Sequence, residues 1–524
     1  MGRRFNTAGP CRPDRHYMIP ALPRLPEAPG LVEQEAYFVV HAPRQTGKTT
    51  TLRALAEELT ASGRYAALWF SCETGQARAD DVGAATRGIL DQITDEARYA
   101  LPPELNPPPW PEASDNSLLS RALTAWADAC PRPLVLVFDE IDALKGAALI
   151  TVLSQLRNGY TGRSTRPFPC SVALVGLRDV RDYKAAAGGA PAALGSSSPF
   201  NIKLESLRLG DFTLDEVRKL YDQHTADTGQ QFAPEAVEYA SELTRGQPWL
   251  VNALAREVVE KIAVPVGEVI TVEHIAAAKE RLILARATHL DSLAARLAEP
   301  RVRAILEPIL AGGIAAFDPY DDGLIYTRDL GLIAPENPPR IANPIYHEVI
   351  PRVLASGVAA TVTANPQAFV LSDGRFDFPG LLTAFAEFWA EHGRALAAKQ
   401  PDYHEIAPHI VLMGFLQRIV NGGGFVDREY GIGSGRIDLL LRWPYTDATG
   451  ARQTQREALE LKVWRKGRSD PLRSALDQLD HYLDGLTLPT GTLIIFDGRG
   501  KKNPRPAIST TTSPASRTIT LLRC

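Results

Sequence analysis

The sequence has little cysteine: five residues in 524, with no two of them in a Cys-x-x-Cys pair. An odd, scattered set argues against a complete disulfide framework and fits a reducing compartment. The ten histidines lack the His-Glu-x-x-His spacing of zinc enzymes. There is no apolar run of membrane length, and the N-terminal region has no apolar signal-peptide core. We therefore expect a soluble, cytoplasmic protein that does not contact a membrane.

A large excess of one charge is also missing, since 57 Lys and Arg residues face 61 Asp and Glu residues and the net charge is -4. Any nucleic-acid contact must therefore come from local basic patches rather than from a globally basic surface. The length exceeds what one hydrophobic core organises, and 45% apolar residues are ample for globular packing. We expect two to four domains.

The first 210 residues predict an arm followed by a nucleotide-binding α/β domain. Residues 1–30 are rich in proline, arginine and glycine, which favours an extended arm lying on the first domain. Residues 31–210 contain short, continuous apolar runs separated by helix-like stretches, as in a parallel sheet covered on both faces. The first run, Tyr37–His41, precedes a glycine-containing loop and a stretch of helical period at Thr50–Leu59. This order is the context that a phosphate-binding loop needs.

The loop Ala42–Thr49 has the residue types that cradle a nucleoside triphosphate. Successive backbone N–H groups can wrap the phosphates, Lys48 can reach the terminal ones, and Thr49 can ligate magnesium. The usual first glycine is Ala42 here, which is tolerated if its φ is negative. The residues expected to bind the nucleotide are Pro43, Arg44, Gln45, Thr46, Gly47, Lys48, Thr49, Thr50, Asp139 and Arg178.

A second motif supports this site, because the apolar strand Leu134–Phe138 leads into Asp139 and Glu140. We expect Asp139 to join Thr49 in the magnesium shell and Glu140 to hold a water in line with the γ-phosphate. Simple helix capping by these acids is the alternative. Arg178, after another apolar run, is either a γ-phosphate sensor or a surface ion-pair residue. ATP and Mg²⁺ are the expected cofactors.

The middle of the chain predicts helices. Residues 211–270 contain helical periods interrupted by Gly246-Gln-Pro248 and predict a lid on the sheet domain. Residues 271–355 predict a winged-helix-like domain, in which Gly331–Asn343 forms a proline-containing hairpin. Direct DNA reading there and a docking or lid role are both open. Residues 356–376 lack a sustained period and predict a linker.

Residues 377–524 predict a small α/β domain with a metal-dependent site. Glu460 and Lys462, two apart on a predicted strand, project to one face, and hairpin pairing can bring Asp438 beside Glu460. Two carboxylates suit magnesium, and Lys462 can orient or deprotonate a water. A surface ion-pair ladder is the alternative. The expected metal ligands of the whole chain are Thr49, Asp139, Glu405, Asp438 and Glu460.

With these motifs, the chain resembles bacterial and archaeal AAA-like ATPases, related to the STAND and archaeal ATPase groups, that carry a C-terminal PD-(D/E)xK nuclease-like domain. The resemblance implies an α/β fold: a P-loop NTPase parallel sheet with a helical lid, a winged helix and a restriction-endonuclease-like domain. It also implies that the arm helps to hold the nucleotide base. Ile437 stands where the nuclease motif usually has a proline before its first acidic residue, which does not by itself remove activity. Arg178 replaces the neutral polar sensor of classical AAA proteins, so a nucleotide-gated switch fits better than a ring motor.

We expect an ATPase in which Glu140 is catalytic. Its nucleotide state is expected to control cleavage of nucleic acid, with DNA as the expected substrate, by the catalytic residues Asp438, Glu460 and Lys462. Defence against foreign DNA or control of mobile elements is the expected setting, and homo-oligomers are compatible with it. One alternative is an ATP-driven switch or scaffold whose C-terminal domain binds DNA or a partner without cutting. Another is a DNA-binding regulator that uses the winged helix.

Overall fold

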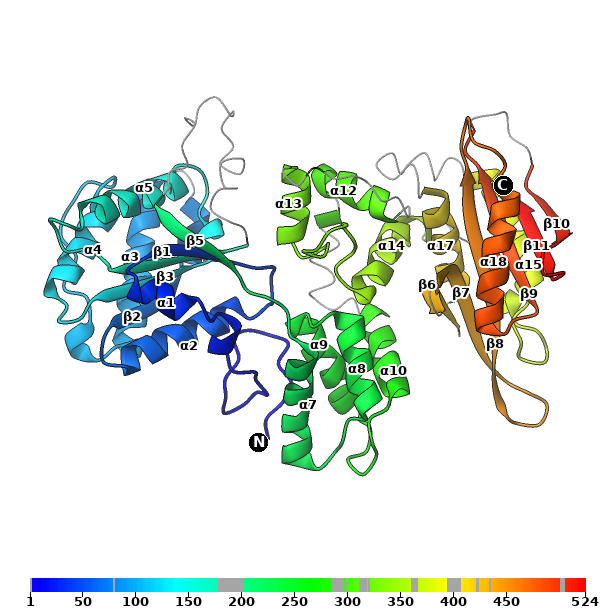
Figure 1. The fold of residues 1–524 in the computed structure, drawn as a ribbon, viewed down its shortest axis with the longest axis horizontal. Helices are drawn as coiled ribbons and strands as arrows, with labels where there is room; N and C mark the ends of the chain where they lie inside the picture. The colour runs from blue at the N-terminus through cyan, green and yellow to red at the C-terminus, as the bar shows by residue number, and fades with distance from the viewer. Residues whose placement is uncertain are drawn as a thin grey trace. The chain divides into compact units, whose positions relative to one another are not determined.

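The computed structural model describes two compact units. The described residues are 2–78, 81–177, 202–284, 296–297, 299–310, 318, 321–359, 366–393, 407–420, 424–432, 435–499 and 505–524. The first unit comprises Met1–Ala285 together with Ile325–Pro335, and the second comprises Arg286–Leu324 together with Glu336–Cys524 (Figure 1). In the part of the chain so described, no helix is both long and apolar enough to cross a membrane.

A parallel sheet forms the centre of the first unit. Its strand order is β2-β3-β4-β1-β5, and every neighbouring pair is parallel. The strands are β1 (Tyr37–His41), β2 (Ala66–Ser71), β3 (Leu134–Asp139), β4 (Ser171–Gly176) and β5 (Lys203–Arg208). The sequence prediction of an α/β fold with a parallel sheet is confirmed.

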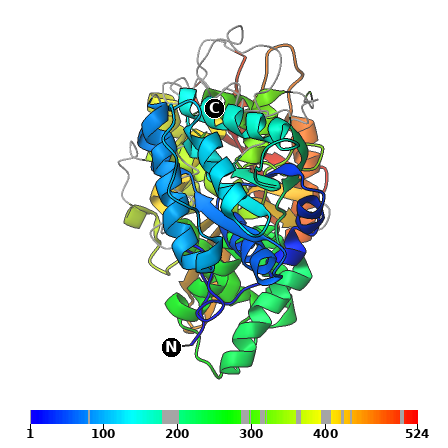
Figure 2. The same cartoon turned by 90° about the vertical axis from the view of Figure 1, so that its left-hand side faces the viewer.

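Helices cover both faces of this sheet, which explains its continuous apolar strands. The flanking helices are α1 (Ala28–Glu33), α2 (Lys48–Ala61), α3 (Val82–Ala100), α4 (Leu118–Ala129) and α5 (Gly146–Gly162) (Figure 2). A short 3-10 turn precedes α1 at Leu22–Arg24, and others lie between the later helices at Glu73–Arg78, Pro103–Leu105 and Ile141–Ala143.

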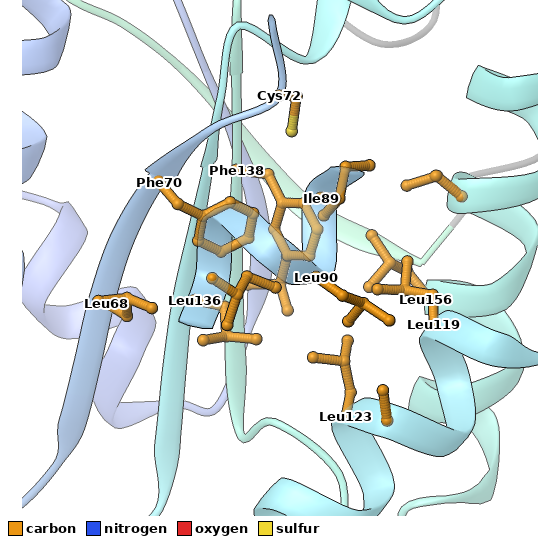
Figure 3. Packing of buried hydrophobic residues seen from close by; sticks show 14 of the residues in the cluster. Leu68, Phe70, Cys72, Ile89, Leu90, Leu119, Leu123, Leu136, Phe138 and Leu156 are labelled. Atoms are coloured by element: carbon orange, nitrogen blue, oxygen red, sulfur yellow. The ribbon is translucent and has the colours of Figure 1, made fainter. Parts of the chain in front are cut away.

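Alternate strand residues enter two different cores. Phe70 and Phe138 belong to the core under α3, α4 and α5, where their rings meet edge to face with centroids 4.6 Å apart (Figure 3). Trp69 and Val137, one residue earlier, belong to the opposite core with α1 and α2. Packing on both faces fixes the ends of β2 and β3, so the polar residues that follow them are held in place.

The remaining helices of the first unit are α7 (Leu214–Thr228), α8 (Pro234–Thr244), α9 (Pro248–Arg256), which continues into a π-helical turn at Glu257–Ile262, and α10 (Val272–Leu284). Thr213 and Glu216 form a reciprocal capping box at the start of α7. Gln247 caps α9, since its Oε1 accepts from the backbone N–H of Leu250 at 2.6 Å. The residues predicted as a lid are therefore helical.

The predicted winged helix stays a prediction, and the segment expected to form its hairpin has no regular strand among the described residues. The helices in this region are α12 (Pro300–Leu310), α13 (Asp322–Asp329) and α14 (Pro344–Ala359). Gly331–Asn343, all of it described, contains turns and single bridge residues instead of paired strands. Its prolines remove the N–H donors that a hairpin ladder needs. Helix α14 also extends past residue 355, where the linker was expected, and Pro366–Phe369 forms a 3-10 turn.

A mixed sheet dominates the second unit, in the order β10-β11-β9-β8-β7-β6. Its strands are β6 (Phe425–Ile432), β7 (Gly435–Thr446), β8 (Arg452–Trp464), β9 (Thr490–Asp497), β10 (Ala507–Thr512) and β11 (Thr518–Arg523). Helix α18 (Leu472–Leu486) joins the parallel pair β8 and β9 and packs on the sheet. Other helical segments are α15 (Phe378–Phe388), the π turn Trp389–Gly393 and α17 (Ala407–Val420).

Candidate functional site

The loop between β1 and α2 has the backbone of a phosphate cradle. Gln45 and Gly47 adopt left-handed conformations with φ of 61° and 90°, which turns successive N–H groups toward one side of the loop. Ala42 does not have a positive φ, and its side chain is buried in the core under α1 and α2. The alanine is therefore accommodated where the usual pattern has a glycine.

Lys48 starts α2 and bends back over this loop. Its Nζ donates to the carbonyl oxygens of Ala42 at 2.7 Å and Pro43 at 2.8 Å. Burial lowers the pKa of Lys48 to about 8, while the carboxylate of Asp139 acts in the opposite direction. A phosphate in the loop would supply the negative charge that this buried ammonium needs.

Asp139, at the end of β3, is 1% exposed and joins three donors. Its Oδ2 accepts from Thr49 Oγ1 at 2.7 Å and from Trp69 Nε1 at 3.0 Å, and its Oδ1 accepts from the backbone N–H of Glu140 at 2.9 Å. The hydroxyl and the carboxylate therefore lie side by side. Hard oxygen donors in such an arrangement fit Mg²⁺.

Glu140 follows in a left-handed conformation with φ of 56°, which turns it away from the strand direction. Its Oε2 accepts from Ser71 Oγ at 2.5 Å. Burial raises the pKa of Glu140, and the Ser71 hydrogen bond opposes that shift. The carboxyl is thus oriented by a neighbouring strand end, as a residue that holds a water must be.

The sequence analysis missed Trp69 and Ser71. Both lie on β2, which pairs in parallel with β3, so that Ser71 stands opposite Asp139. The sequence signal for Ser71 is its position as the polar residue directly after an apolar run. Parallel strands end at the same edge of a sheet, so such a residue lies beside the one that ends the neighbouring strand. Arg53 lies over the Trp69 ring at 3.8 Å and fixes the indole that bonds to Asp139.

Arg24 is a further missed residue, and it ties the phosphate loop to the start of the lid. Its Nη1 donates to the carbonyl oxygen of Thr46 at 3.1 Å and its Nη2 to that of Gly210 at 2.6 Å. Its guanidinium carbon lies 4.7 Å from the ring centroid of Phe212. The Phe212 backbone N–H in turn donates to Gly246 at 2.8 Å. A single guanidinium therefore connects the loop, the end of the sheet and the lid.

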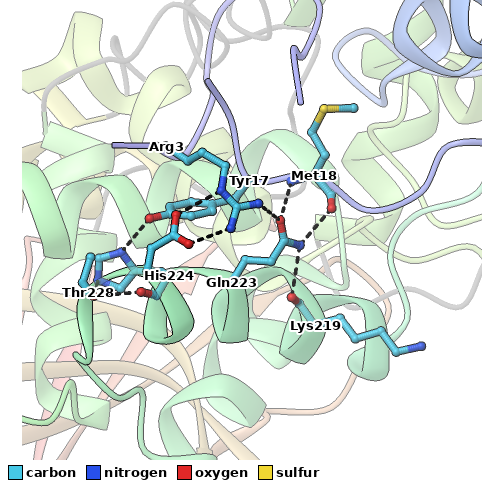
Figure 4. Close-up of polar contacts among 8 residues, drawn as sticks. Arg3, Tyr17, Met18, Lys219, Gln223, His224 and Thr228 are labelled. Atoms are coloured by element: carbon cyan, nitrogen blue, oxygen red, sulfur yellow. Dashed lines mark hydrogen bonds and ion pairs between the residues drawn. The ribbon is translucent and has the colours of Figure 1, made fainter. Parts of the chain in front are cut away.

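The N-terminal arm also forms hydrogen bonds with helix α7 (Figure 4). Gln223 Nε2 donates to the carbonyl oxygen of Met18 at 2.8 Å, and Tyr17 Oη lies 3.3 Å from His224 Nδ1. Near the loop, the backbone N–H of Cys11 donates to Thr50 Oγ1 at 3.1 Å. The arm thus contacts both the nucleotide loop and the lid.

Two predicted site residues, Arg178 and Glu405, lie outside the described residues. Arg44 is described, and its predicted role in binding the nucleotide stays a prediction.

In the second unit, Asp438, Glu460 and Lys462 come together. Strands β7 and β8 are antiparallel, and Leu439 pairs with Leu459, so Asp438, the residue before Leu439, lies close to Glu460 and Leu461. Asp438 Oδ2 accepts a hydrogen bond from the backbone N–H of Leu461 at 2.7 Å. Lys462 Nζ donates to Glu460 Oε1 at 2.6 Å.

Helix α18 completes this cluster. Lys462 Nζ also donates to Gln478 Oε1 at 3.0 Å, and Gln478 Nε2 donates to Tyr482 Oη at 2.7 Å. The two α18 residues are one helical turn apart, so they face the same strand. The ammonium is held between a carboxylate and an amide.

Glu460 carries an uncompensated oxygen. Its side chain is fully buried, and its Oε2 has no hydrogen-bond partner among the described residues. Burial, followed by the neighbouring Asp438, raises the pKa of Glu460 to about 8. Within the described residues no group of three or more His, Cys, Asp or Glu side chains forms a metal cluster. Mg²⁺ often uses only one or two carboxylates and keeps waters, so this pair fits it.

Part of the first unit is similar to a known protein family. Residues 30–163 match the family model described as AAA ATPase domain. The matched segment includes Lys48, Thr49, Asp139 and Glu140. Among curated proteins, none matches the sequence.

The comparison with solved structures finds partial likenesses. They include a Walker-type ATPase of Pyrococcus abyssi, 14% identical, with a TM-score of 0.46 over 66% of this chain and 98% of that chain. They also include Aeropyrum pernix Orc1 in complex with DNA (14%, 0.36, 60% and 78%) and the Thermotoga maritima RuvB Holliday junction branch migration motor (15%, 0.33, 61% and 89%). At these TM-scores we take nothing about activity or partners from the likenesses.

Arg24→Gln is expected to weaken ATP binding about tenfold, because one or both carbonyl oxygens of Thr46 and Gly210 lose a charged donor, at a cost of about 1–3 kcal/mol. Titration with a fluorescent ATP analogue measures the change. Arg15→Gln, at an exposed arginine of the same arm, is the matched control. Equal affinities for the two variants would show that Arg24 does not position the loop.

Glu460→Gln is expected to stabilise the second unit at about pH 8 and much less at about pH 5. The pKa of this carboxyl rises from 4.5 in the unfolded chain to about 8 in the folded one. Such a group costs stability progressively as pH rises between these values. Thermal unfolding across this range measures the effect, with exposed Glu387→Gln as the control. A gain that is the same at every pH contradicts the assignment.

Proposed function

We propose that this chain couples ATP hydrolysis in its AAA ATPase domain to magnesium-dependent cleavage of phosphodiester bonds in nucleic acid. The observation that supports the second half is the meeting of Asp438, Glu460 and Lys462 on neighbouring strands, with one buried carboxylate oxygen uncompensated. DNA is the first substrate class we propose, and control of foreign or mobile DNA is the proposed setting.

In the first unit, the loop residues bind the triphosphate through backbone N–H groups, and Lys48 pairs with its terminal phosphates. Thr49 and Asp139 hold Mg²⁺, which when bound neutralises charge on the phosphates. Glu140, oriented by Ser71, accepts a proton from the water that attacks the γ-phosphate. Hydrolysis thus uses the ends of three elements: α2, β2 and β3.

In the second unit, the carboxylates of Asp438 and Glu460 hold Mg²⁺, whose bound form stabilises charge on the phosphate. Lys462 orients the attacking water through its ammonium, which Gln478 holds in place. Water attack breaks one P–O ester bond and leaves a phosphate monoester and a hydroxyl. The carboxylate that is costly to bury without metal then has its counter-charge.

The proposed link between the two activities starts at the phosphate loop. A β-carbon at Gly331 would lie 2.7 Å from Cβ of Pro43, so this segment packs directly on the loop. Asp329 Oδ1 also lies 3.8 Å from Nδ1 of His41, the last residue of β1. Helix α13, which ends here, begins within the second unit. A change in the loop on ATP binding can therefore shift a chain segment that continues into that unit.

Glu140→Gln is expected to lower ATP turnover about 10²–10⁴-fold while ATP binding persists, because the amide cannot accept the proton. Lys48→Ala should abolish turnover and weaken binding as well. Phosphate release and nucleotide titration separate the two effects. Glu104→Gln, at an exposed position of the same unit, should behave as wild type. Normal turnover in Glu140→Gln excludes its role as the base.

Asp438→Ala and Lys462→Ala are each expected to abolish cleavage while leaving ATP turnover intact, because their contacts lie in the second unit. Labelled single- and double-stranded DNA and RNA, each with Mg²⁺ or Mn²⁺ and with or without ATP, provide the assay. Asp477→Asn, at an exposed position of α18, is the control. A wild-type chain that binds DNA but leaves every substrate intact would instead support the ATP-driven switch or scaffold.

A further inference from the structure

A basic surface surrounds Trp464, where β8, β9 and β11 end. We call it the Trp464 platform. It comprises Trp464 and the basic residues Arg465, Lys466, Arg468, Arg473, Arg499 and Arg523. Trp464 stands opposite Asp497 in the pairing of β8 with β9, and Arg523 stands opposite Ile495 in that of β11 with β9. The sheet therefore brings together basic residues from three separate parts of the sequence.

The tryptophan and two carboxylates hold this surface rigid. Trp464 Nε1 donates to the carbonyl oxygen of Arg468 at 3.0 Å, and Arg499 lies over the Trp464 ring at 3.3 Å. Asp497 pairs with Arg499 at 2.6 Å and Asp470 with Arg523 at 2.8 Å. The two guanidinium groups are thus oriented before any ligand arrives, which reduces the entropy lost on binding.

The charge of the platform is strongly one-sided. Residues 464–473 and 497–499 with Arg523 contain six basic side chains and two carboxylates, although the whole chain has a net charge of -4. Both carboxylates are engaged with Arg499 and Arg523. Lys466, Arg468 and Arg473 are exposed and form no ion pair with any described residue. Like charges gathered in this way repel one another, and a polyanion relieves that repulsion.

The platform lies next to the proposed cleavage site. Trp464 follows Lys462 by two residues on the same strand, so both project to the α18 face about 7 Å apart along β8. Arg473 belongs to the first turn of α18, the helix whose Gln478 contacts Lys462. A phosphate chain that enters the Glu460–Lys462 cluster would pass this surface.

We propose that the Trp464 platform binds the phosphate backbone of double-stranded nucleic acid and guides it to Glu460 and Lys462. The guiding role rests on the proposed function, whereas the binding does not require cleavage. A duplex is favoured over a single strand because the platform offers no free ring for base stacking. One side of Trp464 carries Arg499, and the ring packs against the core under α18.

The test compares two double variants of the full chain that remove the same charge. Lys466→Ala with Arg468→Ala alters the platform, and Arg452→Ala with Arg456→Ala alters the opposite end of β8. Binding to a labelled duplex is measured by anisotropy at several salt concentrations with a chelator present, so that no cutting occurs. Log affinity falls with log salt concentration, and the platform variant should reduce the magnitude of this slope by about 2. The control variant should have the slope of wild type.

Cleavage and ATP turnover are measured in parallel on the same preparations. A duplex-binding slope that is unchanged in the platform variant overturns the inference, even if wild type cleaves DNA. Binding to heparin without binding to any duplex overturns it as well. A reduced slope in a chain that never cleaves supports the platform and removes the cleavage step alone. Thermal unfolding of both double variants that matches wild type shows that the second unit is folded.

Discussion

The buried carboxylate of Asp139 is the interaction on which the nucleotide site depends. A charged group that is almost fully removed from water is stable only when donors replace its hydration. Thr49 on α2, Trp69 on β2 and the backbone N–H of Glu140, directly after β3, supply them. Each donor needs its own element in register, and the two cores of the sheet set that register. Packing far from the site therefore controls the geometry of the site.

Glu460 shows the opposite solution of the same problem. One of its oxygens is paired with Lys462, while the other is buried without a partner among the described residues. The raised pKa of this carboxyl reflects that cost. The free-energy cost of burying an unpaired carboxylate oxygen is tolerated at sites where an opposite charge, such as a metal ion, offsets it. The comparison separates a carboxylate whose two oxygens are both hydrogen-bonded from one with an oxygen that has no partner among the described residues.

The sequence allowed the parallel α/β fold and the meeting of Asp438 with Glu460 to be predicted, because both follow from strand periodicity and pairing. The roles of Trp69 and Arg24 could not be predicted, since they arise from neighbours that lie far apart in the sequence. Ser71 was missed although it is the polar residue directly after an apolar run. The hairpin at Gly331–Asn343 was predicted from glycine and proline alone. Such residues mark a turn, but no apolar alternation was present to specify paired strands. The roles of the individual site residues stay predictions.

The first unit is discontinuous in the sequence, because it consists of Met1–Ala285 and Ile325–Pro335, and the residues between these two segments belong to the second unit. During synthesis the phosphate loop emerges early, yet the segment that packs on Pro43 follows almost 300 residues later. A ribosome-bound chain therefore passes through a stage with an ATP site that lacks one wall. A recombinant fragment that ends after α10 contains every ATPase motif but lacks the segment that packs on Pro43. A natural gene fusion that replaced everything after α10 would lose the same segment.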